Sequence, residues 1–156
     1  MSDDLGLRPP YGISSFVQLR REGYLYVDKT PFIRILEARP EPFVLYLRPR
    51  RFGKSLWLSV LRHYYDVNSE EQFGELFAEL EVGRNPTAKR SSFRVLELDF
   101  SGIVADSAGE AAEGTRLEVI QRTLDFLDRY GLSSAIEPSI LWQLPTAASV
   151  LDTCLR

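Results

Sequence analysis

Hydrophobic residues recur with two different periods along this chain of 156 residues. Apolar residues three or four apart predict helices at about 14–21, 31–38, 54–64, 70–79, 110–130 and 146–155. Short apolar runs predict strands at 24–27, 43–47 and 95–100. The run at 43–47 is continuous, which is typical of a strand buried on both faces of a parallel sheet. The order of these elements favours an α/β layered fold.

The second predicted helix has a recognisable start. Thr30 is expected to be its N-cap and Pro31 its first residue, because a hydroxyl accepts a free backbone N–H and proline has none to offer. Helical spacing then predicts four buried side chains, those of Phe32, Ile33, Ile35 and Leu36. The pattern does not assign a helix or a strand to residues 136–144, because Pro138 and Pro145 interrupt it.

Composition narrows the class of protein. With 44% apolar and 26% charged residues, the chain can form a globular core. Its single cysteine, Cys154, excludes an internal disulfide and so a disulfide-stapled secreted fold. No apolar run approaches the roughly 18 residues that span a bilayer, and the acidic start Met1–Asp4 is unlike a signal peptide. We therefore expect a cytoplasmic protein with no membrane partner.

Charge is distributed unevenly. Residues 1–65 carry 11 Lys and Arg against 6 Asp and Glu, whereas residues 66–156 carry 8 against 16. Within the basic part, Arg48, Arg50, Arg51 and Lys54 fall within seven residues. Such clustering favours an anionic ligand, either a phosphate or a nucleic acid.

The basic cluster belongs to the segment Arg48–Ser55, between the predicted strand 43–47 and the helix after it. The segment matches the last three positions of G-x-x-x-x-G-K-S/T, with Arg48 where the first glycine belongs. In a phosphate loop, a glycine lets the backbone approach the anion, the lysine reaches the β- and γ-phosphates, and the serine hydroxyl binds Mg²⁺. We predict an ATP and Mg²⁺ site formed by Arg50, Arg51, Phe52, Gly53, Lys54, Ser55 and Leu56.

Two other interpretations of this segment stay open. A basic turn before an ordinary helix would need no ligand at all. An arginine-rich module that binds nucleic acid without ATPase activity would use the same cations. Lone residues elsewhere add little, since His63 has no cysteine nearby to share a metal and Cys154 has no histidine partner in sequence.

Two blocks together resemble the AAA-ATPase-like family of prokaryotic proteins: Tyr24–Thr30, reading YLYVDKT, and Leu47–Leu56, reading LRPRRFGKSL. Agreement extends to Phe73–Phe77 and Leu98–Ser101, so the resemblance covers residues 11–155. It implies a P-loop NTPase-like fold with a mostly parallel sheet, and an arginine at position 48 that is normal for the family. It also implies a nuclease-like PD-(D/E)XK region downstream as a partner. The residues Asp28–Thr30 would then either start a helix or lie near the nucleotide.

The resemblance also bears on catalysis. Asp99, at the end of the strand 95–100, is a candidate Mg²⁺ carboxylate, but the acidic strand of the family follows a later helix. The segment 146–155 is similar to that later helix. We therefore expect residues 1–156 to be the N-terminal part of a domain, with a segment at 11–42 and a P-loop core at 43–156 truncated before the acidic strand. Such a fragment would bind ATP with weak or no hydrolysis, and no catalytic residue is assigned.

Overall fold

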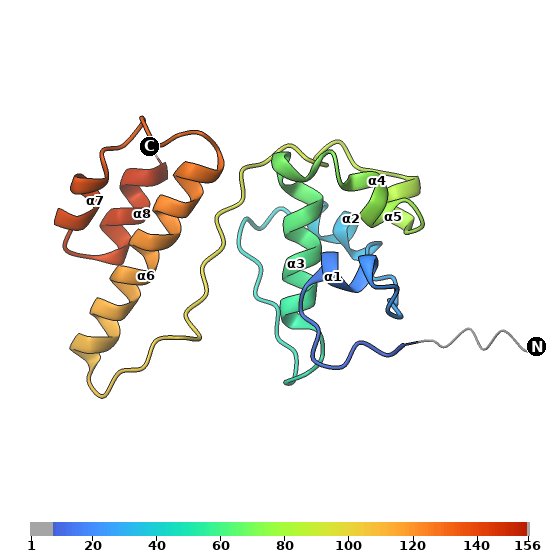
Figure 1. Ribbon diagram of the computed structural model, residues 1–156, viewed down its shortest axis with the longest axis horizontal. Helices are drawn as coiled ribbons and strands as arrows, with labels where there is room; N and C mark the ends of the chain where they lie inside the picture. The colour runs from blue at the N-terminus through green and yellow to red at the C-terminus, as the bar shows by residue number, and fades with distance from the viewer. Residues whose placement is uncertain (1–7, 156) are drawn as a thin grey trace, which may run out of the picture. The chain divides into compact units, whose positions relative to one another are not determined.

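A computed structural model describes residues 8–155, and the chain divides into two compact units, Met1–Phe93 and Arg94–Arg156 (Figure 1). Met1–Asp4, interpreted above as unlike a signal peptide, lies outside the described residues, as does Arg156. Each unit has its own hydrophobic core.

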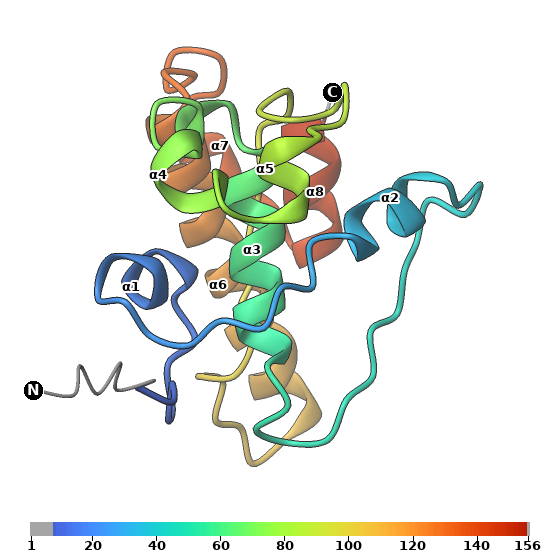
Figure 2. The same ribbon diagram turned by 90° about the vertical axis from the view of Figure 1, so that its right-hand side faces the viewer.

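Short helices surround one longer helix in the first unit (Figure 2). Its elements are α1 (Phe16–Arg21), α2 (Phe32–Glu37), α3 (Lys54–Tyr65), the 3-10 helix η1 (Val67–Ser69), α4 (Phe73–Phe77) and α5 (Glu81–Arg84). Helix α1 packs against α3 and α4, and α4 packs against α5. The predicted helices at 14–21, 54–64 and 70–79 are confirmed, with shorter bounds for the first and third.

Aromatic rings form much of the core of this unit. The ring of Phe77 lies 5.0 Å from that of Phe16, 5.1 Å from Phe73 and 5.7 Å from Tyr64, measured between centroids. The three pairs are tilted, stacked and edge-to-face respectively, and distances of this size are favourable for aromatic pairs. At the end of α4 the chain turns so sharply that Gly83 packs directly on the carbonyl group of Phe77, where any Cβ would overlap it.

Helix α2 departs from its predicted burial. Only Ile33 is buried, whereas Phe32 is 55% and Ile35 is 52% exposed. A helix of six residues turns one narrow stripe toward the core, so the apolar residues on either side of that stripe remain at the surface. Its N-cap is Pro31 and has no side-chain hydrogen bond, so the predicted capping role of Thr30 is wrong.

The second unit is a small group of three helices, α6 (Ala108–Arg129), α7 (Pro138–Gln143) and α8 (Ala147–Leu155). The side chain of Ser107 caps α6 by accepting the Glu110 N–H at 3.2 Å. Helix α6 packs against α7 and α8, around a core of Val119, Ile120, Leu127, Leu141 and Val150. The predicted helices 110–130 and 146–155 are thereby confirmed.

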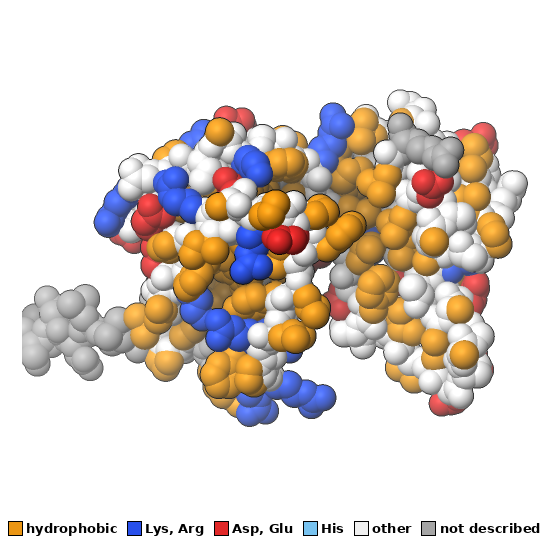
Figure 3. Space-filling view, turned by 180° about the vertical axis from the view of Figure 1, so that it is seen from behind, with side chains coloured by type: hydrophobic (Ala, Val, Ile, Leu, Met, Phe, Trp, Pro, Cys, Tyr) orange, Lys and Arg blue, Asp and Glu red, His pale blue; other side chains and the backbone are white. Residues whose placement is uncertain are grey.

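The predicted α/β fold with a mostly parallel sheet is wrong for the structure of residues 8–155. Strand pairing within them is limited to two isolated parallel bridges, Arg8 with Tyr24 and Asp66 with Phe93. Residues 43–47 are extended and unpaired, with Phe43 89% and Leu45 82% exposed. Figure 3 shows many hydrophobic side chains at the surface of the molecule. An apolar run shows that a segment favours burial, but a strand forms only where a partner pairs its backbone groups.

Among the described residues, none of the helices is both long enough and apolar enough to cross a membrane.

Candidate functional site

The basic segment Arg48–Ser55 forms a tight loop that leads into α3. The N–H of Phe52 donates to the carbonyl of Pro49 at 3.4 Å, which closes a turn. Two residues then adopt left-handed backbone conformations, Arg51 with φ 67° and Gly53 with φ 72°. Glycine takes this conformation freely, but for an arginine it costs about 1–2 kcal/mol. The loop therefore holds backbone strain at Arg51, within the predicted phosphate site.

The start of α3 leaves backbone donors available. Gly53 is its N-cap and supplies no side chain, and the first helical hydrogen bond runs from the Trp57 N–H to the Gly53 carbonyl at 2.9 Å. The N–H groups before Trp57 have no acceptor within the helix. Since α3 has 12 residues, its dipole adds partial positive charge at this end. The arrangement favours an anion at the start of α3.

Lys54 and Arg48 are both engaged within the loop. The Nζ of Lys54 donates to the carbonyl of Arg48 at 2.9 Å. The guanidinium of Arg48 in turn lies 5.6 Å from the ring centroid of Tyr46, a cation–π distance. The ammonium group has three donors, so it can bind a further acceptor without leaving the loop. Arg48, which stands where the motif has its first glycine, thus holds the side chain of Lys54 through its backbone carbonyl.

The predicted site residues lie together in the structure, because they are consecutive in the loop and the first turn of α3. Arg50, Arg51 and Phe52 are exposed, as are Lys54 and Ser55, while Gly53 and Leu56 are half-buried. Which of these residues touch a nucleotide stays a prediction.

A cavity of about 180 Å³ lies beside the start of α3, and sequence analysis did not predict it. One wall is the face of α3 that begins at Gly53, and the other comes from the segment between α1 and α2. That segment passes across α3 in Figure 2. The residues that line the cavity include Pro10, Tyr26, Lys29, Leu56 and Trp57. No residue pattern predicts such a cavity, because its walls are separated by more than twenty residues of chain.

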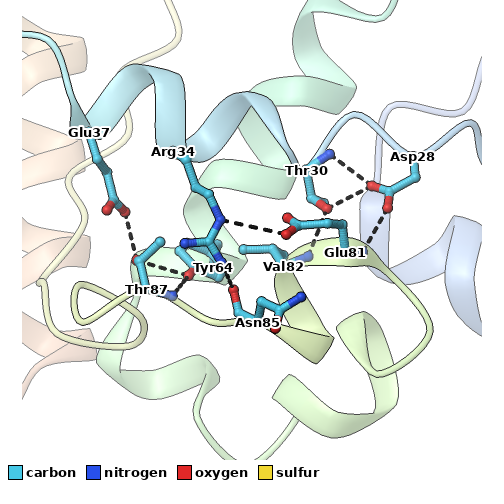
Figure 4. Close-up of polar contacts among 9 residues, drawn as sticks. All are labelled: Asp28, Thr30, Arg34, Glu37, Tyr64, Glu81, Val82, Asn85 and Thr87. Carbon is cyan, nitrogen blue, oxygen red and sulfur yellow. Dashed lines mark hydrogen bonds and ion pairs between the residues drawn. The ribbon is translucent and has the colours of Figure 1, made fainter.

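The residues Asp28–Thr30 have a structural role that is fully visible (Figure 4). One carboxylate oxygen of Asp28 accepts the N–H of Thr30 at 2.8 Å and its hydroxyl at 2.7 Å. The other accepts the N–H of Glu81 at 2.8 Å, at the start of α5. Burial opposes the charge of Asp28, but the Glu81 amide and then the hydroxyl and amide of Thr30 outweigh it and lower the pKa. The turn before α2 is therefore fastened to α5.

Further polar contacts continue from α2 in the same view (Figure 4). Arg34 forms an ion pair with Glu81, with 3.6 Å between Nε and Oε1, and hydrogen-bonds the carbonyl of Asn85. The hydroxyl of Thr87 donates to Glu37 at 2.8 Å, and the Thr87 N–H donates to the hydroxyl of Tyr64 at 2.8 Å. These contacts fix the chain after α5 against α2 and α3.

Asp99, the predicted Mg²⁺ ligand, belongs to the second unit. It is exposed, and its Oδ1 accepts the N–H of Ser101 at 2.9 Å. This amide is the main cause of its lowered pKa. Within residues 8–155 there is no group of three or more His, Cys, Asp or Glu side chains able to hold a metal ion. A Mg²⁺ role for Asp99 stays a prediction.

The remaining reactive side chains have ordinary surroundings. Nδ1 of His63 lies 2.7 Å from the carbonyl of Ser59, one turn earlier on α3. Cys154 is half-buried, and burial raises the pKa of its thiol, which disfavours the nucleophilic thiolate.

The turn formed by Gly53, Lys54 and Ser55 at the start of α3 is typical of proteins that bind an anion at a helix N-terminus. Comparison with known proteins identifies the family to which this chain belongs. Residues 10–144 match the family model AAA-ATPase-like, described as predicted AAA-ATPase. The chain belongs to this family, as its resemblance indicated.

One curated relative extends the comparison. Over 111 residues the chain is 37% identical to "Uncharacterized protein in vnfD 5'region" of Azotobacter chroococcum mcd 1, an alignment covering 67% of this chain and 20% of the relative. The chain thus spans about a fifth of the length of that relative. No solved structure matches this chain.

Proposed function

We propose that this chain binds Mg²⁺ and ATP, with the triphosphate at the start of α3. The observation that supports it most directly is the uncapped first turn of α3 behind Gly53, with Lys54 and Ser55 exposed beside it. Membership of the AAA-ATPase-like family favours nucleotide use independently. The charge also fits, since the exposed Arg50 and Arg51 adjoin the helix start.

The residues present fit both the nucleotide and the metal. Free N–H groups of the first turn would bind phosphate oxygens, as they do wherever a helix begins at an anion. Lys54 would direct one of its other two donors toward the β- and γ-phosphates while it remains bonded to the Arg48 carbonyl. The hydroxyl of Ser55 would take one position around Mg²⁺, whose remaining ligands would be phosphate oxygens and water.

Hydrolysis is a separate matter from binding. Mg²⁺, when bound, neutralises charge that develops on the transferred phosphoryl group, and a carboxylate normally holds it in place. The sequence offers Asp99 as the candidate for this carboxylate. In the structure, Oδ1 of Asp99 accepts the N–H of Ser101. We therefore propose that this chain is a nucleotide-binding module with weak or no hydrolysis of its own.

Titration calorimetry with Mg²⁺ and ATP tests the proposal. Lys54→Ala should weaken binding at least tenfold, because it removes a cation from the triphosphate. Lys89→Ala is the matched control, since it removes an exposed lysine of the same unit away from the loop. Equal affinities of wild type and Lys54→Ala, or loss of binding in both variants alike, would refute the site.

Nucleic acid is a second candidate ligand, favoured by the exposure of Arg48, Arg50 and Arg51 in one short loop. Binding through phosphates would weaken steeply as salt rises from about 50 to 200 mM, because counterions are released. Fluorescence anisotropy with a labelled single-stranded oligonucleotide measures this. A salt-independent signal, or none, would remove this candidate and leave ATP binding unaffected.

A further inference from the structure

Alternate residues of the extended segment between α1 and α2 face in different directions. Leu25, Val27 and Lys29, spaced two residues apart, are exposed and line the cavity beside α3. Asp28 points instead to Thr30 and to the start of α5, where its carboxylate accepts three hydrogen bonds (Figure 4). Such alternation is the rule in extended chain. Lys29 therefore lies on the side of the segment that faces α3, away from the carboxylate next to it in sequence.

The opposite wall of the cavity begins at the proposed phosphate site. It includes Gly53, Leu56 and Trp57, and the free N–H groups of α3 follow directly after Gly53. Gly53 and Lys29 thus line one space of about 180 Å³. An anion bound at the first turn of α3 lies at one end of this space, and the flexible four-carbon stem of a lysine on the other wall can reach toward it.

Lys29 is the charged residue among those that line the cavity, and the others are apolar, aromatic or glycine. Among residues 8–155, no carboxylate forms an ion pair with the Lys29 ammonium. The nearest carboxylate in sequence, that of Asp28, is engaged by Thr30 and Glu81. A cation beside walls of low polarity attracts an anion more strongly than one on an open surface, because water screens it less. The surroundings of Lys29 therefore favour an anionic ligand.

We propose that Lys29 is a second phosphate-binding cation of the site, donating hydrogen bonds to the triphosphate from the wall opposite α3. This inference rests on the proposed function, because the triphosphate must be held at the start of α3. Lys54 reaches the phosphates from the helix itself, with its Nζ bonded to the Arg48 carbonyl. The triphosphate would thus be bound between two lysines that come from distant segments of the chain.

Titration calorimetry with two ligands, Mg·ATP and Mg·tripolyphosphate, measures the contribution of this lysine. Lys29→Met keeps an apolar stem but removes the charge, and it should weaken both ligands about 5- to 20-fold, the value of one charged hydrogen bond. Lys29→Arg keeps the charge, so both affinities should stay within about threefold of wild type. Lys89→Met is the matched control, because it makes the same change on an exposed lysine that does not line the cavity. It should alter neither affinity.

Failure of this inference can be told apart from failure of the proposed function. If wild type binds neither ligand, the phosphate site itself is wrong. If wild type binds both and Lys29→Met has no effect, or weakens ATP alone, Lys29 does not bind phosphate, and Lys54→Ala decides whether the site at α3 stands. Equal losses in Lys29→Met and Lys29→Arg would also overturn the inference, because the charge of the side chain would then be irrelevant.

Chemical labelling of amines gives a second, independent readout. The chain has three lysines, Lys29, Lys54 and Lys89. Mass spectrometry after brief treatment with an acylating reagent should show that Mg·ATP protects Lys29 and Lys54, and that Lys89 is labelled as in the free protein. Protection of Lys54 without Lys29 would overturn the inference, whereas protection of neither would contradict the phosphate site.

Discussion

The hydroxyl of Thr30 accepts a hydrogen bond from the backbone N–H of Val82 at 3.2 Å, and both residues are completely buried. The same hydroxyl donates to Asp28. One side chain thus joins the turn before α2 to the first turn of α5, 52 residues later. These hydrogen bonds give Thr30 a structural role that requires no nucleotide.

Replacing Thr30 by valine keeps the shape but removes both hydrogen bonds. The buried N–H of Val82 would then have no acceptor, so unfolding should require about 2 kcal/mol less. Thr30→Ser keeps the hydroxyl and loses one buried methyl group, at a cost of about 1 kcal/mol. Urea unfolding followed through Trp57, in a Trp142→Phe background, measures both. Equal loss in the two variants would contradict the hydrogen-bonded role.

Acid should weaken the first unit through Asp28. Its pKa is lower in the folded state than its ordinary value of 3.8, so its contribution is complete above that pH and is lost as pH falls through the folded value. The stability difference between wild type and Asp28→Asn should be constant from about pH 5 to 7 and shrink below about pH 4. Urea unfolding at each pH measures it, with Glu71→Gln as an exposed control. A difference that grows in acid would have the wrong sign.

Gly53 should tolerate a side chain sterically but not conformationally. An added Cβ meets no atom within 4 Å, yet φ is +72°, so alanine should cost about 1 kcal/mol and weaken ATP binding by disturbing the loop. Gly74→Ala also meets open space but lies inside α4 with ordinary backbone angles, so it should stabilise by up to about 1 kcal/mol. The same sign of change in both variants would contradict the left-handed conformation at Gly53.

Turnover of ATP by these residues should be slow. Residues 8–155 contain no group of three or more side chains able to hold a metal ion, so we expect the charge on the transferred phosphoryl group to be poorly stabilised. We expect a rate well below about 1 per second, the low end of ordinary enzymes. A coupled assay of released phosphate measures it. A faster rate that Asp99→Asn abolishes would show that this aspartate holds the metal after all.

The sequence predicted helices better than strands, for a physical reason. The periodicity of α3 and α6 is contained within each segment, so Trp57, Val60 and Ile120 indicate their own burial. The run at 43–47 has the composition of a buried strand, but its pairing depends on other parts of the chain. In the structure it is unpaired, and Phe43 is almost fully exposed.

In the candidate site, too, the features contained in one segment could be predicted, and those that depend on distant parts of the chain could not. The loop and the first turn of α3 are one continuous segment, so their residues could be identified from the motif alone. The cavity could not, because Tyr26 and Trp57 come to line the same space only after the chain has folded back. The sequence pointed to Asp28 and Thr30 as a helix start or a nucleotide contact, and nothing in it linked them to Glu81 and Val82, with which they form hydrogen bonds.

Backbone amide shifts measured by NMR during titration with Mg·ATP test the central claim most directly. Phosphates at the start of α3 should move the amide signals of Gly53, Lys54, Ser55 and Leu56 more than those of any other segment of the first unit. Lys54→Ala should require at least tenfold more nucleotide for the same shifts. Signals at Gly53 to Leu56 that stay unchanged at saturating ATP, with the largest shifts elsewhere, would contradict a nucleotide site at the start of α3.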